Sequence, residues 1–430
     1  GSRHYFILPQ IEFRRLGNIL PEKVWFEGLK AMFKKFGMDL TSVVALGIGS
    51  IVGAGIFALL GQVIVMAGDR TYYSFLLAGT VALFSGYSYA RLSRRYPQYG
   101  GLTNYFHLAF KSKFVSGGLT FVYLLTSAIS ISMMAKSFGI YATEFFDYIP
   151  PVERYVNMFA LGLIAAMAVI NMLGSAEVGW SEIFMVGFKL TVLLVLIIAA
   201  WFHFGPDLPA TNIKPTSNLQ FFGSIGITFF AYAGYGVITN AASDVADPQK
   251  TIPRAIYITL FLVMSLYCGL AFVVLNFIPG SELYGNPDTA VATAAKRLLG
   301  SGGQAVMYLT AVIAFISGIS ATFFSIFRIT RSLAHQHILP AFYMHTFWRH
   351  GTFGNLLTTV LIMLATVFFD FTSIVNLSSA AFLVSYLGVF AAAWVLRRET
   401  QSNPLVIIIG SVFMLLIFGL FMANILLSPQ

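Results

Sequence analysis

Two stretches of the sequence place several glycines inside long apolar segments, where a helix would otherwise continue. Residues 49–57 read GSIVGAGIF, and residues 221–243 read FFGSIGITFFAYAGYGVITNAAS. Each glycine destabilises a helix interior by roughly 1 kcal/mol relative to alanine, so both segments are expected to break. A break frees main-chain N–H groups, which suit a carboxylate, and C=O groups, which suit an ammonium. The chemistry indicated is the binding of a zwitterion by main-chain atoms.

Close helix packing is the alternative explanation for these glycines. Gly49-x-x-x-Gly53 fits the small-xxx-small pattern by which helices approach each other in membranes. Irregular backbone at membrane depth survives only where it lines a cavity or is buried in protein. Two interrupted segments, the first and the sixth of the chain, favour the binding explanation, because paired broken helices in two repeats mark the central site of a transporter.

A lysine stands inside another apolar segment. Lys189 lies about eight residues into the run at 181–204, and an ionisable residue at membrane depth is a functional candidate by default. Burial disfavours the charged amine, so such a lysine could exchange a proton. The alternative is a side chain that extends to the membrane interface. That alternative is the favoured one for Lys136, near the outer part of its own segment.

The elements that carry these residues are predicted membrane spans. Of 430 residues, 57% are hydrophobic and 10% are charged, against about 25% charged in a soluble domain. Apolar runs long enough to cross about 30 Å of hydrocarbon lie near 40–67, 72–91, 114–146, 155–174, 181–204, 221–242, 255–278, 303–327, 354–370, 372–396 and 404–427. The sequence therefore predicts an all-α integral membrane protein with about 11 transmembrane helices.

Positive charge is distributed unevenly between the loops. With a cytoplasmic N-terminus, 19 of the 26 Lys and Arg residues fall in cytoplasmic segments and five in outer ones, as the positive-inside rule expects. Most of the net charge of +9 then faces anionic lipid, and nucleic acid is not an expected partner. The prediction is a multi-pass protein of the cell membrane.

Three regions are expected along the chain. Residues 1–38 form a cytoplasmic segment whose stretch 22–37 has apolar and lysine-bearing faces, typical of an interfacial amphipathic helix, with a disordered basic tail as the alternative. Residues 39–400 form a ten-helix transporter core, and residues 401–430 form an additional transmembrane helix.

Four motifs in order carry a resemblance to a known family. They are GSIVGAGIF, YSYARLSRRYPQYGGLTNYFHLAF, FFAYAGYGVITNAASDVADPQKTIPRAI and RITRSLAHQHILPAF. The chain resembles the amino-acid permeases of the amino acid–polyamine–organocation superfamily. Through YGVITNA and SEIFMVGFKLTVLLVL it is most similar to their ApcT type of proton-coupled transporters. The resemblance implies a LeuT-like 5+5 inverted-repeat fold in which helices 1 and 6 are broken.

For the substrate, the resemblance implies main-chain contacts at both breaks. The amides expected to meet a carboxylate are those of Val52, Gly53, Ala54 and Gly55. The carbonyls expected to meet an ammonium lie around Phe229, Phe230 and Ala231. Phe230 also falls where the family places an aromatic gate. The implied binding set is completed by Ser50, Tyr232, Gly234 and Gly236, of which Tyr232 could equally serve packing.

For ion coupling, the resemblance places Lys189 where sodium-coupled relatives hold a cation between helices 1, 5 and 8. The lysine is then expected near the Gly49 carbonyl of helix 1 and near Ser317 or Ser320 of helix 8. Its ammonium would replace the metal ion, so no metal and no cofactor are expected.

The absence of charged residues from the two broken helices limits which amino acids the pocket is expected to bind. Leu40 to Met66 and Phe221 to Ser243 contain no charged residue. Gly236 stands where some relatives that carry cationic substrates place an acidic residue. A neutral, small or medium amino acid is therefore expected. Ser243, followed by Asp244, replaces an acidic residue that many relatives use at an inner gate.

Three hypotheses for function remain at this stage. The first is a secondary active transporter that imports neutral amino acids by proton symport with alternating access. The second is an exchanger of amino acids or amines, or a K⁺ carrier, of the same fold. The third is a non-transporting sensor or channel. No Walker motif and no Ser-His-Asp set at a consistent depth occurs in the sequence, so neither ATP-driven transport nor an enzyme is expected.

Overall fold

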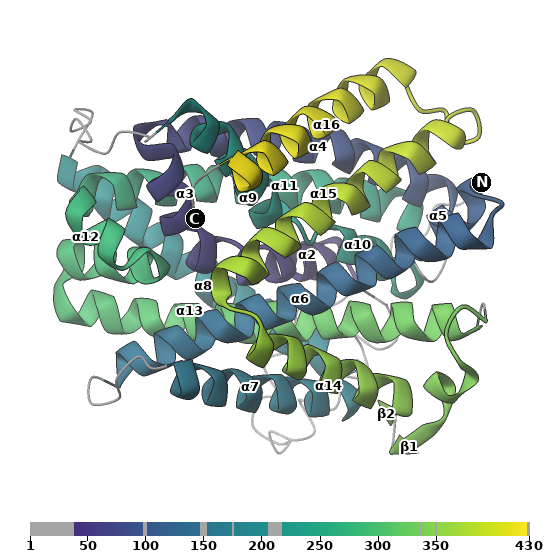
Figure 1. Ribbon diagram of the computed structural model, residues 1–430, viewed down its shortest axis with the longest axis horizontal. Coiled ribbons are helices and arrows are strands. Elements are labelled where there is room, and N and C mark those ends of the chain that lie inside the picture. Colours follow the sequence, from purple (N-terminus) through teal and green to yellow (C-terminus); the bar gives the residue numbers. More distant parts are fainter. Residues whose placement is uncertain are drawn as a thin grey trace, which may run out of the picture.

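The computed structural model describes residues 38–97, 101–146, 153–173, 176–204, 217–335, 337–348 and 351–427. The chain folds into a bundle of long helices (Figure 1). The predicted interfacial helix at 22–37 lies outside the described residues.

The helices, in chain order, are α2 (Leu40–Ala54), α3 (Ile56–Ala67), α4 (Thr71–Arg95), α5 (Leu102–Ala109), α6 (Lys113–Phe145), α7 (Glu153–Leu173), α8 (Ala176–Phe204), α9 (Asn218–Tyr232), α10 (Gly236–Asn240), α11 (Pro248–Phe277), α12 (Gly280–Gly285), α13 (Ala290–His335), α14 (Phe353–Phe368), α15 (Phe371–Val395) and α16 (Pro404–Leu427). Short 3₁₀ turns are η1 (Gly68–Arg70), η2 (Ala242–Asp244), η3 (Pro287–Thr289) and η4 (Ala341–Met344). The strands β1 (Thr346–Trp348) and β2 (Gly351–Thr352) pair antiparallel.

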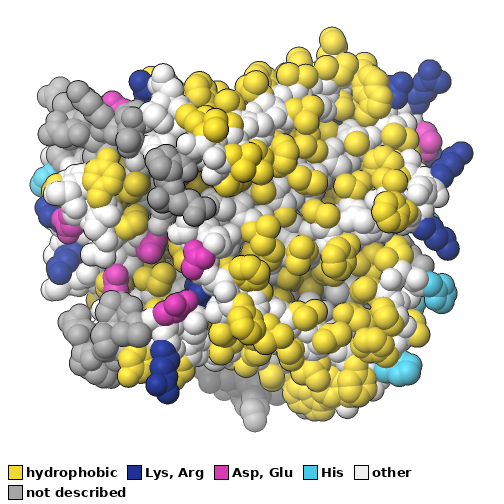
Figure 2. Space-filling view, viewed as in Figure 1, with side chains coloured by type: hydrophobic (Ala, Val, Ile, Leu, Met, Phe, Trp, Pro, Cys, Tyr) yellow, Lys and Arg dark blue, Asp and Glu magenta, His cyan; other side chains and the backbone are white. Residues whose placement is uncertain are grey.

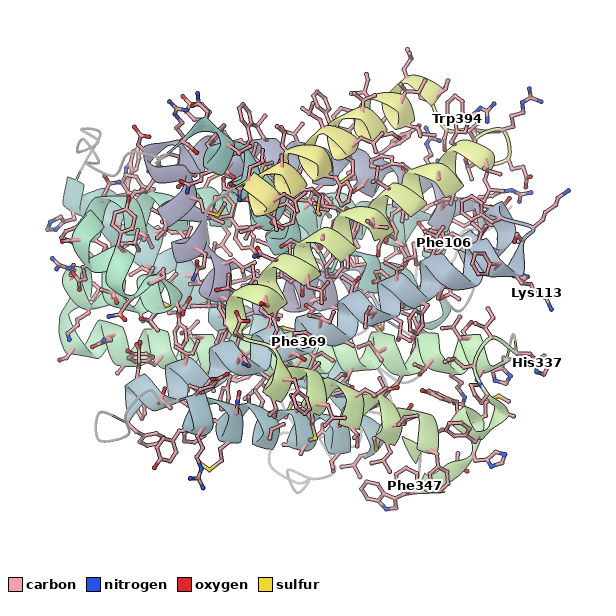
Figure 3. The ribbon with its side chains drawn as sticks, in the orientation of Figure 1. Phe106, Lys113, His337, Phe347, Phe369 and Trp394 are labelled. Atoms are coloured by element: carbon pink, nitrogen blue, oxygen red, sulfur yellow. The ribbon has the colours of Figure 1, made fainter. Side chains whose placement is uncertain are left out.

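The surface of the bundle matches a membrane environment. Hydrophobic side chains cover the middle of the visible face, and Lys and Arg gather mainly towards its ends (Figure 2). Lys113 and His337 lie together at one of these ends (Figure 3). In the described part, eight helices are long and apolar enough to cross a membrane, or nine when the bent run from α2 to α4 is included. Helix α14 is shorter, at 16 residues, and the total of 11 spans stays a prediction.

Both glycine-rich stretches are interrupted. The chain bends by 49° between Leu40–Gly53 and the helical run Ile56–Arg95, with the break between α2 and α3. Helix α9 ends at Tyr232, Ala233 is extended, and Gly234 has φ +124° before α10 begins at Gly236. That φ lies where a side chain is strained and glycine is not. The expected breaks in the first and sixth spans are therefore present.

The broken helices lie at the centre of the bundle. In the 18-residue apolar window of the α9–α10 span 89% is buried, against 28% in the corresponding window of α16. Helix α2 packs against α8, α11 and α13, and α6 and α13 pack against each other. Polar main-chain groups at the breaks are thus surrounded by protein rather than lipid, which is the condition for interrupted backbone at this depth.

Candidate functional site

One tyrosine joins the two breaks. The Tyr267 hydroxyl of α11 lies 3.1 Å from the Ile51 carbonyl oxygen and 3.0 Å from the Ala231 carbonyl oxygen, so its single proton can be donated to either carbonyl or shared between them. Gly55 makes this approach possible, because a Cβ there would lie 2.5 Å from both the Ala231 oxygen and the Tyr267 hydroxyl. The breaks therefore form one polar junction, and Tyr267 is a member that the sequence reasoning missed.

The first break is located at Gly55. Val52, Gly53 and Ala54 lie inside α2, and the Gly55 N–H donates to the Ile51 carbonyl at 3.0 Å. The amides without a partner inside their own helix are therefore those of the first turn of α3, residues 56–58. These amides stand at the positive end of the α3 dipole, which suits an anionic group.

Close helix packing also explains one glycine in the first stretch, residues 49–57. A Cβ on Gly53 would lie 2.5 Å from the Gly318 Cα, so the backbones of α2 and α13 meet at these two glycines. The packing explanation therefore applies to Gly53, while Gly55 allows the two breaks to approach each other.

The predicted residues of the second break have distinct surroundings. The Phe230 carbonyl accepts from the Ala233 N–H at 2.9 Å, and the Phe230 ring lies 5.2 Å from that of Phe382 on α15. The Phe229 ring contacts Tyr386. The Tyr232 hydroxyl donates to the Phe75 carbonyl at 3.1 Å, so Tyr232 packs against α4.

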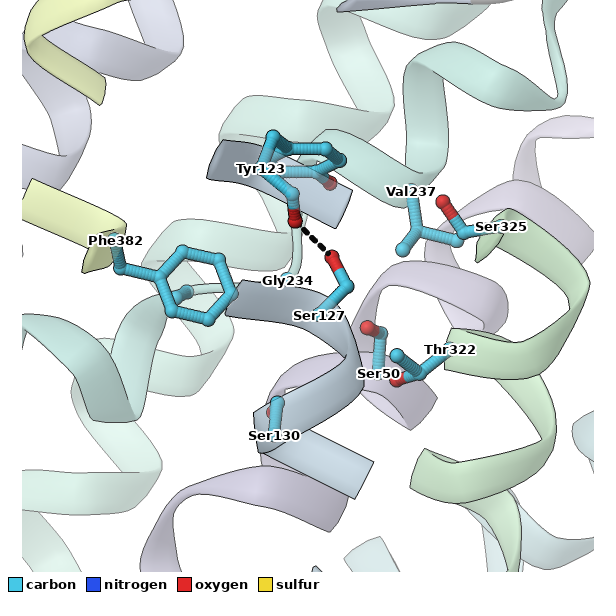
Figure 4. Close-up of a pocket in the computed structure, with 10 residues that line it drawn as sticks. Ser50, Tyr123, Ser127, Ser130, Gly234, Val237, Thr322, Ser325 and Phe382 are labelled. Atoms are coloured by element: carbon cyan, nitrogen blue, oxygen red, sulfur yellow. Dashed lines mark hydrogen bonds between the residues drawn. The ribbon is translucent and has the colours of Figure 1, made fainter. Parts of the chain in front are cut away.

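A small cavity adjoins both breaks (Figure 4). Its lining residues are Ser50, Tyr123, Ser127, Ser130, Ala233, Gly234, Val237, Thr322, Ser325 and Phe382. The space open to the centre of a water molecule is about 10 Å³, which is room for about one water. An amino acid can therefore occupy the cavity only after its walls move apart.

Six of the ten lining residues lie outside the two broken helices, and the sequence reasoning named none of these six. Ser127 and Ser130 belong to α6, Thr322 and Ser325 to α13, and Phe382 to α15. The two serines of α6 and the two residues of α13 could have been identified from their spacing in the sequence. Each pair is three residues apart, which places its hydroxyls on one face of an apolar helix.

Lys189 is fully buried at a meeting point of three helices. Its Nζ on α8 donates to the Gly49 carbonyl of α2 at 3.3 Å and to the Ser317 hydroxyl of α13 at 3.0 Å. Ser320 has another partner, since its hydroxyl accepts from Asn171 at 3.3 Å. Of the predicted coupling residues, the structure thus brings together Lys189, Gly49 and Ser317.

Lys136 is also buried, with an exposed fraction of 3%. Its Nζ donates to the Phe369 carbonyl at 2.5 Å, between α14 and α15, and lies 3.4 Å from a Glu153 carboxylate oxygen. The prediction that this side chain extends to the membrane interface is therefore wrong. Lys136 instead connects α6 to α7 and to the junction of α14 with α15.

At the end of the bundle where α12 lies, helix α3 is in close contact with the loop around Pro287. A Cβ on Gly61 of α3 would lie 1.8 Å from the Pro287 carbonyl oxygen. Next to it, Gln62 Nε2 donates to an Asp288 carboxylate oxygen at 2.8 Å. The loop around Pro287 therefore covers α3 with no space between the two backbones.

An ion pair closes the α10 end. Arg328 of α13 donates to the Asp244 carboxylate at 2.9 Å and to the Asn240 carbonyl at 2.9 Å. The Met38 N–H donates to the Asp244 carbonyl at 2.7 Å. The acidic residue of this ion pair is thus Asp244, the residue that follows Ser243.

A comparison with known protein families identifies the family of this chain. A family model described as amino acid permease matches residues 38–430. The chain belongs to the amino acid permease family. This permease is a multi-pass membrane transporter of the amino acid–polyamine–organocation superfamily with a LeuT-like fold, as the resemblance implied.

Individual relatives agree with the assignment. The permease is 40% identical over 380 residues to the inner membrane transport protein YbaT of Escherichia coli, covering 88% of each chain. It is 29% identical to an uncharacterised protein of Methanocaldococcus jannaschii, with 90% of each chain covered. It is 22% identical to the serine/threonine exchanger SteT of Bacillus subtilis, over 88% of this chain and 90% of that one.

Proposed function

We propose that this permease imports neutral amino acids by proton symport with alternating access. The observation that carries the proposal is the position of Lys189. A fully buried amine donates to the Gly49 carbonyl of the first broken helix and to Ser317 of α13. Protonation of this amine creates a cation that holds α2, α8 and α13 together, and its loss weakens those contacts.

The junction of the two breaks supports the binding of a zwitterion. The first turn of α3 supplies N–H groups and a positive helix end for a carboxylate. Carbonyl groups at Ile51 and Ala231 are held by Tyr267 in the closed state. Movement of Tyr267 would release two acceptors that suit an ammonium.

The surroundings of the cavity support a neutral substrate. None of its ten lining residues is charged. A charged substrate side chain would be left without a partner in a site surrounded by protein, which is strongly unfavourable. Gly236, where some relatives place an acidic residue, has two tyrosine hydroxyls 3.2 Å from the position of a Cβ, those of Tyr89 and Tyr123.

For orientation, we propose that the α10 end faces the cytoplasm and the α12 end faces outwards. The loop charges counted from the sequence support this direction. The contacts at Gly61 and Pro287 then form the outer closure, and the Asp244–Arg328 pair forms the inner one. Alternating access requires each closure to open in turn.

The proposal is tested by uptake into liposomes that contain the purified protein. A panel of radiolabelled neutral, acidic and basic amino acids is supplied with the outside at lower pH than the inside. We expect accumulation of neutral amino acids only, abolished when a protonophore removes the gradient. Uptake that a protonophore leaves unchanged would contradict proton symport.

Exchange is the second candidate, because one relative is named a serine/threonine exchanger. The two functions differ in their need for internal substrate. A symporter fills empty vesicles, whereas an obligatory exchanger transports only into vesicles preloaded with an amino acid. We expect uptake into empty vesicles, and its absence there together with rapid uptake into preloaded ones would favour exchange.

A further inference from the structure

We propose that the substrate of this permease has a small side chain that ends in a hydroxyl group, and that Ser127 of α6 and Thr322 of α13 select it. The inference rests on the proposed function and narrows its substrate class. It concerns the cavity beside the two breaks, whose wall chemistry differs from that of an apolar side-chain pocket.

The cavity lies beside the segments that would bind the zwitterion. Ser50 of α2 and Gly234 between α9 and α10 both belong to the broken helices and both line it. A substrate held by its carboxylate and ammonium at the breaks therefore has this cavity open to its side chain. The residues on the far wall then decide which side chain fits.

Hydroxyl groups dominate that wall. Six of the ten lining residues carry one: Ser50, Tyr123, Ser127, Ser130, Thr322 and Ser325. Pockets for apolar ligands are lined mainly by hydrophobic side chains with few polar groups. Here apolar surface is joined by six hydroxyl-bearing residues, which favours a ligand that can also form hydrogen bonds along its side chain.

Two of these hydroxyls are restricted to accepting. Ser127 donates its proton to the Tyr123 carbonyl at 2.9 Å, and Thr322 donates its proton to the Gly318 carbonyl at 2.7 Å. A hydroxyl has one proton and two lone pairs, so each oxygen keeps acceptor sites on the cavity side. A ligand with a donor group satisfies them, whereas an alkyl group of the same size removes water and leaves them unpaired.

The remaining walls set the size and the apolar part of the side chain. Figure 4 shows the Phe382 ring on one side of the cavity, Thr322 and Ser325 on the other, and Ser127 between them. Val237 and Phe382 supply apolar surface for a methylene or methyl group. Because the closed cavity holds about one water, the smallest hydroxyl side chains require the least movement of its walls.

Pairs of amino acids with the same shape test the proposal. Threonine and valine differ by exchange of a hydroxyl for a methyl group, and so do serine and α-aminobutyrate. We measure the Kd of each by titration calorimetry of the purified protein. We expect each hydroxyl compound to bind at least about tenfold more tightly than its partner, since the alkyl compound loses the hydrogen bond and also leaves a buried acceptor unpaired.

Variants test whether Ser127 and Thr322 cause the preference for the hydroxyl compounds. The double variant Ser127→Ala with Thr322→Val removes both acceptors, and we expect the threonine-to-valine ratio of Kd values to approach one while the Kd of valine stays constant or falls. The matched control is Ser137→Ala with Thr310→Val. These hydroxyls make the same kind of bond, to Met133 and Val306, on the same two helices and do not line the cavity. The control should keep the wild-type ratio.

The outcomes separate this inference from the proposed function. Equal wild-type affinities within both pairs overturn the hydroxyl selection and leave amino-acid transport standing, and this comparison needs no variant. A double variant that keeps the wild-type ratio overturns the assignment to Ser127 and Thr322. Stabilisation of the protein by K⁺ or Na⁺ and by no amino acid would contradict the proposed function itself, since the same oxygens would then serve a metal cation.

Discussion

Lys189 Nζ lies 3.0 Å from the hydroxyl oxygen of Ser317, so a buried amine on α8 is bound to the centre of α13. The same nitrogen reaches the Gly49 carbonyl of α2. A proton gained or lost at one atom thus alters contacts between three helices. Five predictions start from this contact and proceed outward to the ends of the bundle.

Replacement of Lys189 should uncouple transport from protons. In Lys189→Met the side chain stays unbranched, becomes one atom shorter and loses its titratable group, so we expect uptake driven by a pH gradient to fall at least about tenfold. The matched control is Thr191→Ala, an exposed position two residues along the same helix whose hydroxyl donates only locally, to Gly187. Coupled uptake at the wild-type level in Lys189→Met would remove this residue from the mechanism.

Ser317→Ala tests the same contact through the pH profile of uptake. The Ser317 hydroxyl accepts from the ammonium and therefore stabilises the protonated state. A hydrogen bond to a charged group contributes about 1.5–3 kcal/mol, and 1.36 kcal/mol corresponds to one pH unit. We expect the midpoint of the pH profile to move by about one to two units towards acid pH. A profile that stays in place would show that Ser317 does not affect the coupling proton.

Gly55→Ala should disrupt the junction between the breaks. The added Cβ would lie 2.5 Å from the Ala231 carbonyl oxygen, and backbone can relieve such a contact only by moving. We expect loss of amino-acid binding in the calorimetric titration. The control is Gly419→Ala on α16, where a Cβ meets nothing within 4 Å. Wild-type binding by Gly55→Ala would show that the close approach of the two breaks is not required.

Asp244→Asn should open the α10 end of the bundle. The variant weakens the pair with Arg328, a side chain with an exposed fraction of 15%, where an ion pair is screened less than at the surface. The opening is measured in a Cys268→Ser background with Val237→Cys as a reporter. The rate at which this cysteine reacts with a soluble maleimide should rise severalfold in Asp244→Asn.

The exposed pair Lys250–Asp247 provides the comparison for that variant. These side chains have exposed fractions of 72% and 53%, and Lys250→Ala should leave the maleimide rate unchanged. An equal rise in both variants would indicate general loosening of the fold, and no rise in Asp244→Asn would contradict the closing role of the pair.

Asp370 should stabilise the start of α15 in a pH-dependent way. Its carboxylate accepts from the Ser373 side chain and N–H, and these bonds lower its pKa below the ordinary value of 3.8. A lowered pKa contributes stability above the unfolded value that is lost as the pH falls through the folded one. Asp370→Ala should destabilise the fold by about 1 kcal/mol at neutral pH.

The pH dependence of thermal melting checks this prediction. The difference between wild type and Asp370→Ala should be constant from pH 7 to about pH 5, begin to shrink below about pH 4, and reach its minimum only below the lowered pKa of Asp370, where the carboxyl is protonated. Asp69→Ala, in a 3₁₀ turn without a side-chain cap bond, should show no such trend. A difference that persists at the lowest pH would show that the charge of Asp370 is not involved.

The sequence led to the breaks because glycine has a direct local cost in a helix. Gly234, with φ +124°, and Gly55 could both be found without knowing what lies beside them. Lys189 was found because charge is rare in an apolar span, and its expected neighbours Gly49 and Ser317 came from the family resemblance. The structure brings these three together, and their role in coupling stays a prediction.

Contacts between distant helices could not be read from a single sequence. Ser127 and Thr322 meet across the cavity only because α6 packs on α13, and nothing local in either helix specifies its partner. Lys136 was misjudged for the same reason: its acceptor, the Phe369 carbonyl, is 233 residues away along the chain. Hydroxyl residues at spacing i, i+3 in an apolar helix are the sequence feature that could have indicated the cavity wall.

Proton movement caused by an amino acid tests the central claim most directly. Liposomes that contain the protein and a trapped pH-sensitive dye are prepared with equal pH on both sides, and a neutral amino acid is added outside. If substrate held at the two breaks moves with a proton carried by Lys189, the interior acidifies in wild type and stays constant in Lys189→Met. Entry of the labelled amino acid into wild-type vesicles without acidification would contradict the account.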